Sequence, residues 1–308
     1  MAAPAVGGAG RARGLNRLAR LSPTAQGILL MLGAIFLFST MDATAKALMT
    51  RYEPLQVVWA RYAGMMAVAA LVLAPRLGPL LRTRHLGFQL LRSAFLFAAT
   101  FSFFTALSHM EIAAATAVMQ VHPVLLTLGA ALVLREPLGP RRIFGIAAAL
   151  TGALIVIRPG ADVFTPSALL PLLGGVFYAS YALTTRFLGR DEPILTSFLY
   201  TGIIGTLVAS VLAVPVWQTP STMDAAIFLG LGAVGALGQF MLIRSLTLAE
   251  AGAVAPFGYI GVVFATLWGA FAFGELPDLW TAVGALVIIG AGVYVWHRET
   301  RARALAAA

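Results

Sequence analysis

The chain of 308 residues is 60% hydrophobic and only 11% charged, whereas soluble domains average roughly 45–50% apolar and 25% charged residues. This composition excludes an ordinary water-soluble core. A formal net charge of +9 would indicate a nucleic-acid partner in a soluble chain, but here the basic residues lie in short stretches between apolar runs and indicate membrane orientation. The absence of cysteine excludes disulfides, thiolate nucleophiles and cysteine-ligated metals.

Apolar runs long enough to cross a bilayer, about 18 residues or more, recur along the chain. Dividing the sequence at its charge and proline clusters predicts ten helices: 26–49, 55–74, 86–107, 112–134, 142–157, 168–188, 194–216, 223–246, 253–274 and 279–296. The fifth is short for a span of about 20 residues, and we expect it to extend over Arg141. The first run contains Asp42 and Lys46 and has no small-residue cleavage site, so we interpret it as a retained span.

The basic residues predict the orientation. Most lie on one side of the predicted spans: in the N-terminal arm, in the loops after the second, fourth, sixth and eighth spans, and in the tail. We count Arg92 in the loop after the second span, and only Arg51 and Arg158 lie on the opposite side. Because short cytoplasmic loops are enriched in Lys and Arg, we expect an inner (plasma) membrane protein with both termini cytoplasmic and an even number of spans.

The chain repeats itself. A shift of 139 positions aligns Glu53-Pro54 with Glu192-Pro193, Glu111 with Glu250 and Glu136 with Glu275 without a gap, and so long a register indicates duplication. The predicted units are a basic cytoplasmic arm (1–24), a first repeat (25–158), a second repeat (159–297) and a cytoplasmic tail (298–308).

Each repeat has an odd number of spans, so the second enters the membrane from the opposite side. The predicted fold is an all-α polytopic membrane protein of ten transmembrane helices in two inverted five-helix repeats, an arrangement typical of secondary transporters that work by alternating access. The alternative is that duplication only builds a stable bundle. In either case we expect the small residues of the helices to serve close packing, namely Gly232, Gly235, Gly238, Gly284, Gly290 and Gly292.

Charged residues inside spans cost about 2.5–3.5 kcal/mol on insertion scales and usually face a partner or a cavity. Asp42 and Lys46 share a face of the first span, and Arg61 lies at similar depth in the second. Two interpretations stay open. Asp42 forms a structural ion pair with Lys46 or Arg61, or the surplus cation binds an anionic or hydrogen-bond-accepting ligand. A coupling proton on Asp42 is a third hypothesis.

Two spans carry helix breakers at corresponding positions. In the fourth, Gln120 and His122 precede Pro123, and the repeat register places Gln120 opposite Tyr259, which follows Pro256 in the ninth. Paired interruptions in the two halves are the best sequence pointer to a transporter's binding site. We therefore expect Gln120 and Tyr259 to bind substrate. His122 is either a ligand or proton carrier, or a hydrogen-bonding residue between helices.

Polar side chains also interrupt the sixth and eighth spans. Tyr178 and Tyr181 could stack on a flat ligand and donate hydrogen bonds, and Gln239 lies in otherwise apolar sequence. The alternative for the tyrosines is an interfacial aromatic belt.

No Walker-type phosphate loop, His-Glu-x-x-His or Gly-x-Ser-x-Gly motif is present, which argues against ATP-driven transport and against an enzyme. A membrane-embedded enzyme remains a remote alternative. We expect no cofactor, no metal and no nucleic-acid partner; the expected partners are a small-molecule substrate and the lipid bilayer.

Several segments together carry a family resemblance: Met41-Asp-Ala-Thr-Ala-Lys46, Trp59-Ala-Arg-Tyr62, Ala106-Leu107, Leu134-Arg-Glu136 and Phe273-Gly-Glu275. Over nearly its whole length the sequence resembles the EamA-type branch of the drug/metabolite transporter superfamily. The resemblance implies a cavity lined by spans one to four and six to nine, with a homodimer contact through spans five and ten.

The resemblance also implies secondary transport of a small metabolite. Uptake of riboflavin or S-adenosylmethionine is one hypothesis, and export of amino acids or other metabolites is the other. Glu136 and Glu275 are expected to make helix-end or gating contacts at opposite membrane faces.

Overall fold

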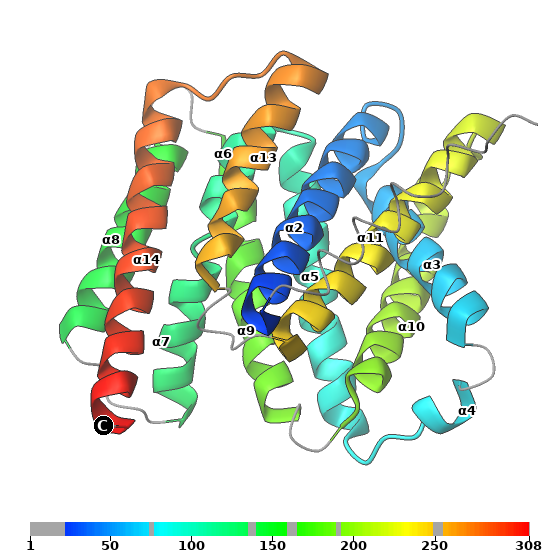
Figure 1. Cartoon of the computed structure of the whole chain (residues 1–308). Helices are drawn as coiled ribbons and strands as arrows, with labels where there is room; N and C mark the ends of the chain where they lie inside the picture. The colour runs from blue at the N-terminus through cyan, green and yellow to red at the C-terminus, as the bar shows by residue number, and fades with distance from the viewer. Residues whose placement is uncertain are drawn as a thin grey trace, which may run out of the picture.

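The computed structural model describes residues 22–73, 77–134, 140–158, 165–188, 192–248 and 255–307, and all regular structure in these ranges is helical (Figure 1). The first half contains α2 (Pro23–Leu48), α3 (Pro54–Leu73), α4 (Leu77–Leu80), α5 (Leu86–Leu107), α6 (Ile112–Met119), α7 (His122–Leu134) and α8 (Pro140–Ile157). The second contains η2 (Pro166–Leu169), α9 (Leu170–Leu188), α10 (Ile194–Ala213), η3 (Val214–Val216), α11 (Thr222–Leu248), η4 (Ala255–Tyr259), α13 (Ile260–Trp268), the π-helical η5 (Gly269–Phe273) and α14 (Leu279–Ala307).

Most predicted helix bounds agree with the structure. The third span has the predicted ends, and α8 begins at Pro140, which confirms that the short fifth span extends over Arg141. One bound is wrong: α14 does not end near residue 296 but continues to Ala307, through most of the segment assigned to the tail.

Proline and serine set several helix starts. The hydroxyl of Ser22 accepts a hydrogen bond from the backbone N–H of Ala25 at 3.2 Å, and Pro23 occupies the first turn of α2. Proline also begins α3 and α8. Proline suits this position because the first N–H groups of a helix have no partner within it, so the sequence determines where these helices begin.

Contacts between the two repeats occur in equivalent pairs, so that exchanging the repeats gives the same set of contacts. The contact of α2 with α11 corresponds to that of α9 with α5, and the contact of α3 with α11 corresponds to that of α10 with α5. The contacts of α8 with α14, of α3 with α10 and of α6 with α13 join equivalent helices (Figure 1). The two halves therefore pack on each other as approximate equivalents.

The chain is a multi-pass membrane protein. Six helices are long and apolar enough to cross a bilayer, and four shorter apolar helices accompany them in the described part of the chain. Large apolar side chains are exposed on the bundle surface, such as Val211 (73%), Phe271 (84%) and Leu286 (69%). Exposed apolar side chains on long apolar helices suit contact with lipid.

Glycines allow close approach of helices from different repeats. A Cβ atom at Gly232 of α11 would overlap the backbone of Gly64 in α3, and one at Gly284 of α14 would lie 2.7 Å from the carbonyl oxygen of Gly152 in α8. The packing role expected of the small residues is confirmed for Gly232 and Gly284. Gly290 is an exception, because a Cβ there would meet no atom within 4 Å.

Candidate functional site

The fourth span is broken at the predicted place. Helix α6 ends at Met119 and α7 begins at His122. Because Pro123 has no N–H, it cannot donate the helical hydrogen bond to the carbonyl of Met119, four residues earlier. The Nδ1 atom of His122 lies 3.0 Å from that carbonyl oxygen, so this nitrogen carries a hydrogen and donates it. The imidazole therefore satisfies the acceptor that Pro123 leaves free.

The interruption in the second repeat lies against the first. The 3₁₀ segment η4 precedes α13, and its Gly258 carbonyl accepts a hydrogen bond of 3.0 Å from Nε2 of Gln120. In the repeat register Gln120 corresponds to Tyr259, the residue that follows Gly258. The side chain of Gln120 thus joins the two helix interruptions directly.

Tyr259 itself faces another helix. Its side chain is buried, and a Cβ added at Gly292 of α14 would overlap its hydroxyl oxygen. The ring therefore fills the space beside Gly292. The structure brings Tyr259 to the interruption through its backbone, and its side chain packs on α14.

Three aromatic rings connect the interruption to α9. The ring of His122 lies edge-on to Tyr178 at 4.7 Å between centroids, and Tyr178 lies 5.5 Å from Tyr181. His122 and Tyr178 come from different repeats. The structure thus brings together three of the predicted site residues.

A second group surrounds Arg61. Its Nη1 donates to Oγ1 of Thr100 at 3.1 Å, and its guanidinium lies over the rings of Tyr62 and Phe104 at 5.6 and 5.7 Å from their centroids. The charge of Arg61 acts on Asp42, yet none of the ion pairs between described residues includes Asp42. The predicted Asp42–Arg61 ion pair is therefore not formed between these described residues, and Arg61 binds Thr100 instead.

Lys46 has a different partner from those predicted. Its Nζ lies 2.6 Å from Oε1 of Glu275 and donates to the carbonyl of Met110 at 2.6 Å. Glu275 also accepts a hydrogen bond from the N–H of Ile112, the first residue of α6, at 3.1 Å. The proposed Asp42–Lys46 pair is thus wrong, because the long lysine side chain reaches Glu275 in the loop that follows η5. The helix-end contact expected of Glu275 is confirmed; Glu136 lies outside the described residues.

Gln239 lies half-buried on α11. The repeat register places it at the position of Thr100, which binds Arg61 in the other half. Its neighbour Gly238 lies against Phe38 of α2, so Gln239 is on a helix that packs against the helix of Asp42.

Arg92 corrects the sequence interpretation. The charge count assigns this arginine to a cytoplasmic loop, but it lies within α5 and is only 5% exposed. Its guanidinium binds Tyr181 and Thr185 of α9 and Ser197 and Thr201 of α10. The signal was present, because Arg92 lies six residues into the predicted third span, about as deep as Arg61 in the second.

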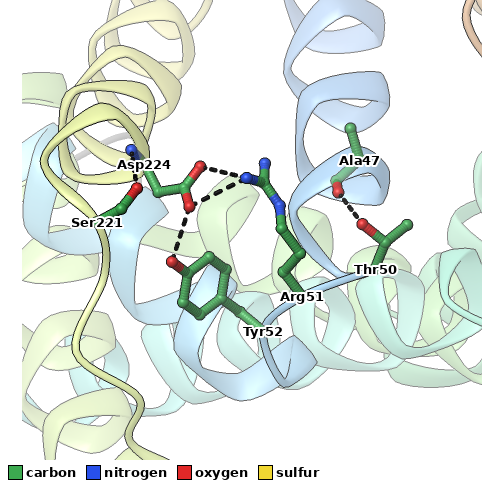
Figure 2. A network of polar contacts seen from close by, with 6 residues as sticks. All are labelled: Ala47, Thr50, Arg51, Tyr52, Ser221 and Asp224. Carbon is green, nitrogen blue, oxygen red and sulfur yellow. Dashed lines mark hydrogen bonds and ion pairs between the residues drawn. The ribbon is translucent and has the colours of Figure 1, made fainter.

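We call the end of the bundle that carries residues 49–53, 108–111 and 274–278 the upper end, after its place in Figure 1. A polar network missed by sequence reasoning lies there (Figure 2). Arg51 forms an ion pair with Asp224 at 2.8 Å, and the hydroxyl of Tyr52 donates to the same carboxylate at 2.8 Å. Burial and the hydrogen bond to Asp224 raise the pKa of Tyr52.

A further ion pair closes the upper end beside α8. Arg158, at the end of α8, pairs with Asp278 at 2.6 Å. Burial alone would raise the pKa of Asp278, but hydrogen bonds from Thr281 and the contact with Arg158 outweigh it and hold the pKa below its ordinary value. Nearby Glu111 behaves oppositely: burial, then the charges of Glu275 and Asp278, raise its pKa.

The ion pairs at the upper end all join the two repeats with the same polarity. Among the described residues they are Lys46–Glu275, Arg51–Asp224 and Arg158–Asp278. In each, the base belongs to the first repeat and the acid to the second, and each lies at the upper end. No group of three or more His, Asp or Glu side chains suited to a metal occurs in the described ranges.

Comparison with known proteins agrees with this organisation. The model of the EamA-like transporter family matches residues 25–158 and, again, residues 165–296. A crystal structure with 23% sequence identity superposes with a TM-score of 0.59, over 90% of this chain and 98% of the other, and shows the same fold.

Three curated proteins illustrate the range of relatives. A riboflavin transporter of Vibrio cholerae is 29% identical over 90% of this chain and 94% of its own length. An S-adenosylmethionine uptake transporter of Rickettsia prowazekii is 25% identical over 89% of this chain and 94% of its own. A pseudopaline exporter of Pseudomonas aeruginosa is 28% identical over 85% and 93%, respectively.

Proposed function

The chain belongs to the EamA-like transporter family, and from this premise we propose that it moves a small organic metabolite across the inner membrane by alternating access between its two repeats. It is a transporter and not an enzyme, as the family and the names of its relatives indicate. The observation that carries the mechanism is the hydrogen bond between Gln120 and Gly258. It joins the helix interruptions of the two halves, where a transporter's site is expected.

We propose ten membrane crossings in two inverted five-helix repeats. The second crossing of each half corresponds to α3 and α10, and the fourth to α6–α7 and to η4–α13. The exchange-related packing of α2 on α11 and of α9 on α5 supports this assignment. The excess of Lys and Arg in the arm, the loops and the tail supports cytoplasmic termini, and the upper end then faces the outside.

The proposed binding residues fall into two groups. Asp42, Arg61, Gln120, His122, Tyr178, Tyr181 and Gln239 contact the metabolite. Lys46 and Tyr259 act at the edges of the site: Lys46 holds the upper end closed through Glu275, and Tyr259 fixes the second interruption by packing on Gly292.

The ion pairs at the upper end supply a gate. All three join one repeat to the other, so separating the repeats there must break them together. The described conformation is then closed to the outside. Access from the outside requires these pairs to open, and a bound metabolite must favour one conformation by differential contact.

Two substrate classes follow from the relatives. Uptake of riboflavin or S-adenosylmethionine is the first, because relatives with these names align along nearly the whole chain. Export of amino acids or other metabolites is the second, because the relative named a pseudopaline exporter aligns over 85% of this chain. A homodimer through α8 and α14 is a further proposal. It is supported by exposed apolar side chains on both helices, such as Phe144 (66%) and Leu286 (69%).

The test begins with purified protein in a thermal-shift screen against riboflavin, S-adenosylmethionine, nucleosides and amino acids. Each compound that raises the unfolding temperature is then offered to proteoliposomes, and its accumulation is measured. We expect one class to do both. A screen in which no compound stabilises the protein or crosses the membrane would contradict the proposed function.

A cysteine scan through residues 118–123 tests the site separately, because the natural chain contains no cysteine. We expect substituted residues at the interruption to react with a small water-soluble maleimide, and the bound metabolite to slow that reaction. Uniform protection in the absence of ligand would rule out a site at the interruption.

A further inference from the structure

Arg92 places a positive charge inside the bundle. Its Nε donates to Oγ1 of Thr185 at 2.7 Å, Nη1 to the carbonyl of Ser197 and to Oγ1 of Thr201, both at 2.8 Å, and Nη2 to the hydroxyl of Tyr181 at 2.8 Å. All of these acceptors are uncharged. No acidic side chain pairs with Arg92 in the described part of the chain.

This arrangement uses four of the five N–H donors of Arg92 and leaves its charge uncompensated. Guanidinium has five N–H donors. Four of them donate the bonds just described, so one N–H on Nη2 remains. A charged side chain within a membrane span is expensive and normally marks a functional site or pairs with an opposite charge. The remaining donor and the uncompensated charge both suit an anion.

The position of Arg92 relates it to the proposed site. The repeat register pairs its partner Tyr181 with Asp42, and Thr185 with Lys46. Arg92 therefore contacts, on α9, the two positions that carry charged side chains on α2. Its guanidinium lies over the ring of Tyr181, 4.6 Å from the centroid, and Tyr178 continues from there to His122 at the interruption.

The cation without an acidic partner is not the one that the sequence suggests. Lys46 is neutralised by Glu275, so it is not the surplus cation that the sequence suggested. Among the described residues, neither Arg61 nor Arg92 forms an ion pair with an acid, and Asp42 is the one acid that the described part of the first span carries. Two cations against one carboxylate leave a net positive site.

We propose that Arg92 recognises a carboxylate on the transported metabolite, with the ring of Tyr181 beside the bound group. The inference rests on the proposed function and names a substrate class for it: metabolites that carry an amino-acid-type carboxylate. A guanidinium N–H donates a short, charge-assisted hydrogen bond to a carboxylate, and Nη2 has one N–H free for this bond.

A purely structural role is the competing explanation, since Arg92 bridges α5, α9 and α10. The two differ in what a substitution does to ligands of different charge. A structural bridge affects every ligand alike, whereas a carboxylate-binding residue affects only ligands that have the carboxylate. The test must therefore compare two ligands that differ in this group alone.

S-adenosylmethionine and its decarboxylated form are such a pair, and riboflavin serves as a probe without a carboxylate. Their affinities are measured by calorimetric titration of the full chain in nanodiscs. The proteins are the unchanged chain, Arg92→Gln, Arg92→Lys and the control Arg84→Gln, which removes an exposed arginine preceding the same helix. Size-exclusion elution and the unfolding temperature establish that each variant folds.

We expect the unchanged chain to bind S-adenosylmethionine about tenfold more tightly than the decarboxylated form, as one charge-assisted hydrogen bond allows. Arg92→Gln should remove this preference by weakening S-adenosylmethionine alone. Arg92→Lys should keep part of it, because the charge stays and the fork is lost. Arg84→Gln should keep it entirely.

Other results would overturn the inference. Equal weakening of both ligands by Arg92→Gln, or failure of both Arg92 variants to fold, assigns Arg92 a structural role. Binding of riboflavin without binding of S-adenosylmethionine by the unchanged chain rejects the carboxylate and leaves the proposed transport function standing. If none of the probes binds, this inference is rejected, and the thermal-shift screen against the wider set of compounds decides the proposed function separately.

Discussion

Lys46 and Glu275 form an ion pair of 2.6 Å that joins α2 of the first repeat to the end of the fourth segment of the second. Glu275 at the same time receives the first N–H of α6. One carboxylate therefore connects Lys46, the start of α6 and the loop before α14.

Replacing Lys46 by Gln should make the upper end open more often. The side chains of Lys46 and Glu275 are only 12% and 25% exposed, so the substitution removes a partly buried ion pair from the closed state. We expect it to shift the opening equilibrium by about 1.4 kcal/mol, which corresponds to a tenfold change. With Gln120→Cys as reporter in the cysteine-free chain, a membrane-impermeant maleimide added outside should label about tenfold faster. Lys46→Arg should label at the original rate, and an unchanged rate in Lys46→Gln would contradict the gate.

Asp224 should contribute strongly to stability. Its carboxylate receives Arg51 and the buried hydroxyl of Tyr52 (Figure 2), so Asp224→Ala leaves a buried donor unsatisfied. That loss costs about 1–3 kcal/mol and should lower the unfolding temperature in detergent by several degrees. Arg51→Gln is the matched control: the arginine side chain is 53% exposed, and exposed pairs contribute about 0–1 kcal/mol. Equal losses in the two variants would contradict the assigned roles.

Asp278 and Glu111 should give stability opposite dependences on pH. The folded pKa of Asp278 lies below its ordinary 3.8, so its ionised form stabilises the fold above that pH, and the contribution disappears as pH falls through the folded pKa. The folded pKa of Glu111 lies above its ordinary 4.5. Its contribution is present below pH 4.5 and disappears as pH rises through the folded pKa.

Unfolding temperatures measured between pH 3 and 7 check both signs. Asp278→Asn should be less stable than the unchanged chain at pH 7 and approach it near pH 3. Glu111→Gln should be at least as stable as the unchanged chain at pH 7. Parallel curves for the chain and both variants would show that neither carboxyl group titrates with folding.

Gly232 should tolerate no side chain. A Cβ there would overlap the backbone of Gly64, and since backbone atoms cannot rotate away, α3 and α11 must separate. Overpacking of this kind costs about 1–3 kcal/mol. Gly230→Ala in the same helix is the control, because a Cβ there meets nothing within 4 Å. Thermal unfolding should show a loss for Gly232→Ala and no loss for Gly230→Ala.

The helices and their interruptions followed from the sequence because their causes are local. Apolar runs, charge clusters and prolines act on their own segment, and the missing N–H of Pro123 accounts for the break of the helix at Met119. The duplication was equally visible, since it is a property of residue order. The extension of α14 to Ala307 was not, because charged residues such as Arg298 form helix as readily as apolar ones.

Partner choice depended on the tertiary structure. Asp42 and Lys46 share a face by helical spacing, yet Lys46 binds Glu275, far away in sequence, because the loop after η5 lies within reach of its long side chain. Tyr259 likewise has the position expected from the register, but the rotation of its segment sends its ring toward Gly292. Sequence spacing gives the face of one helix and contains no information on which distant helix covers it.

The sequence by itself determined that this is a duplicated, multi-span membrane transporter with paired helix breaks. Hydrophobicity and backbone chemistry act residue by residue, so these features are readable without a fold. Only the tertiary structure decided that Gln120 meets Gly258 and that Arg92 is buried against α9 and α10. These contacts depend on the approach and rotation of helices from separate repeats, which packing of the whole bundle sets.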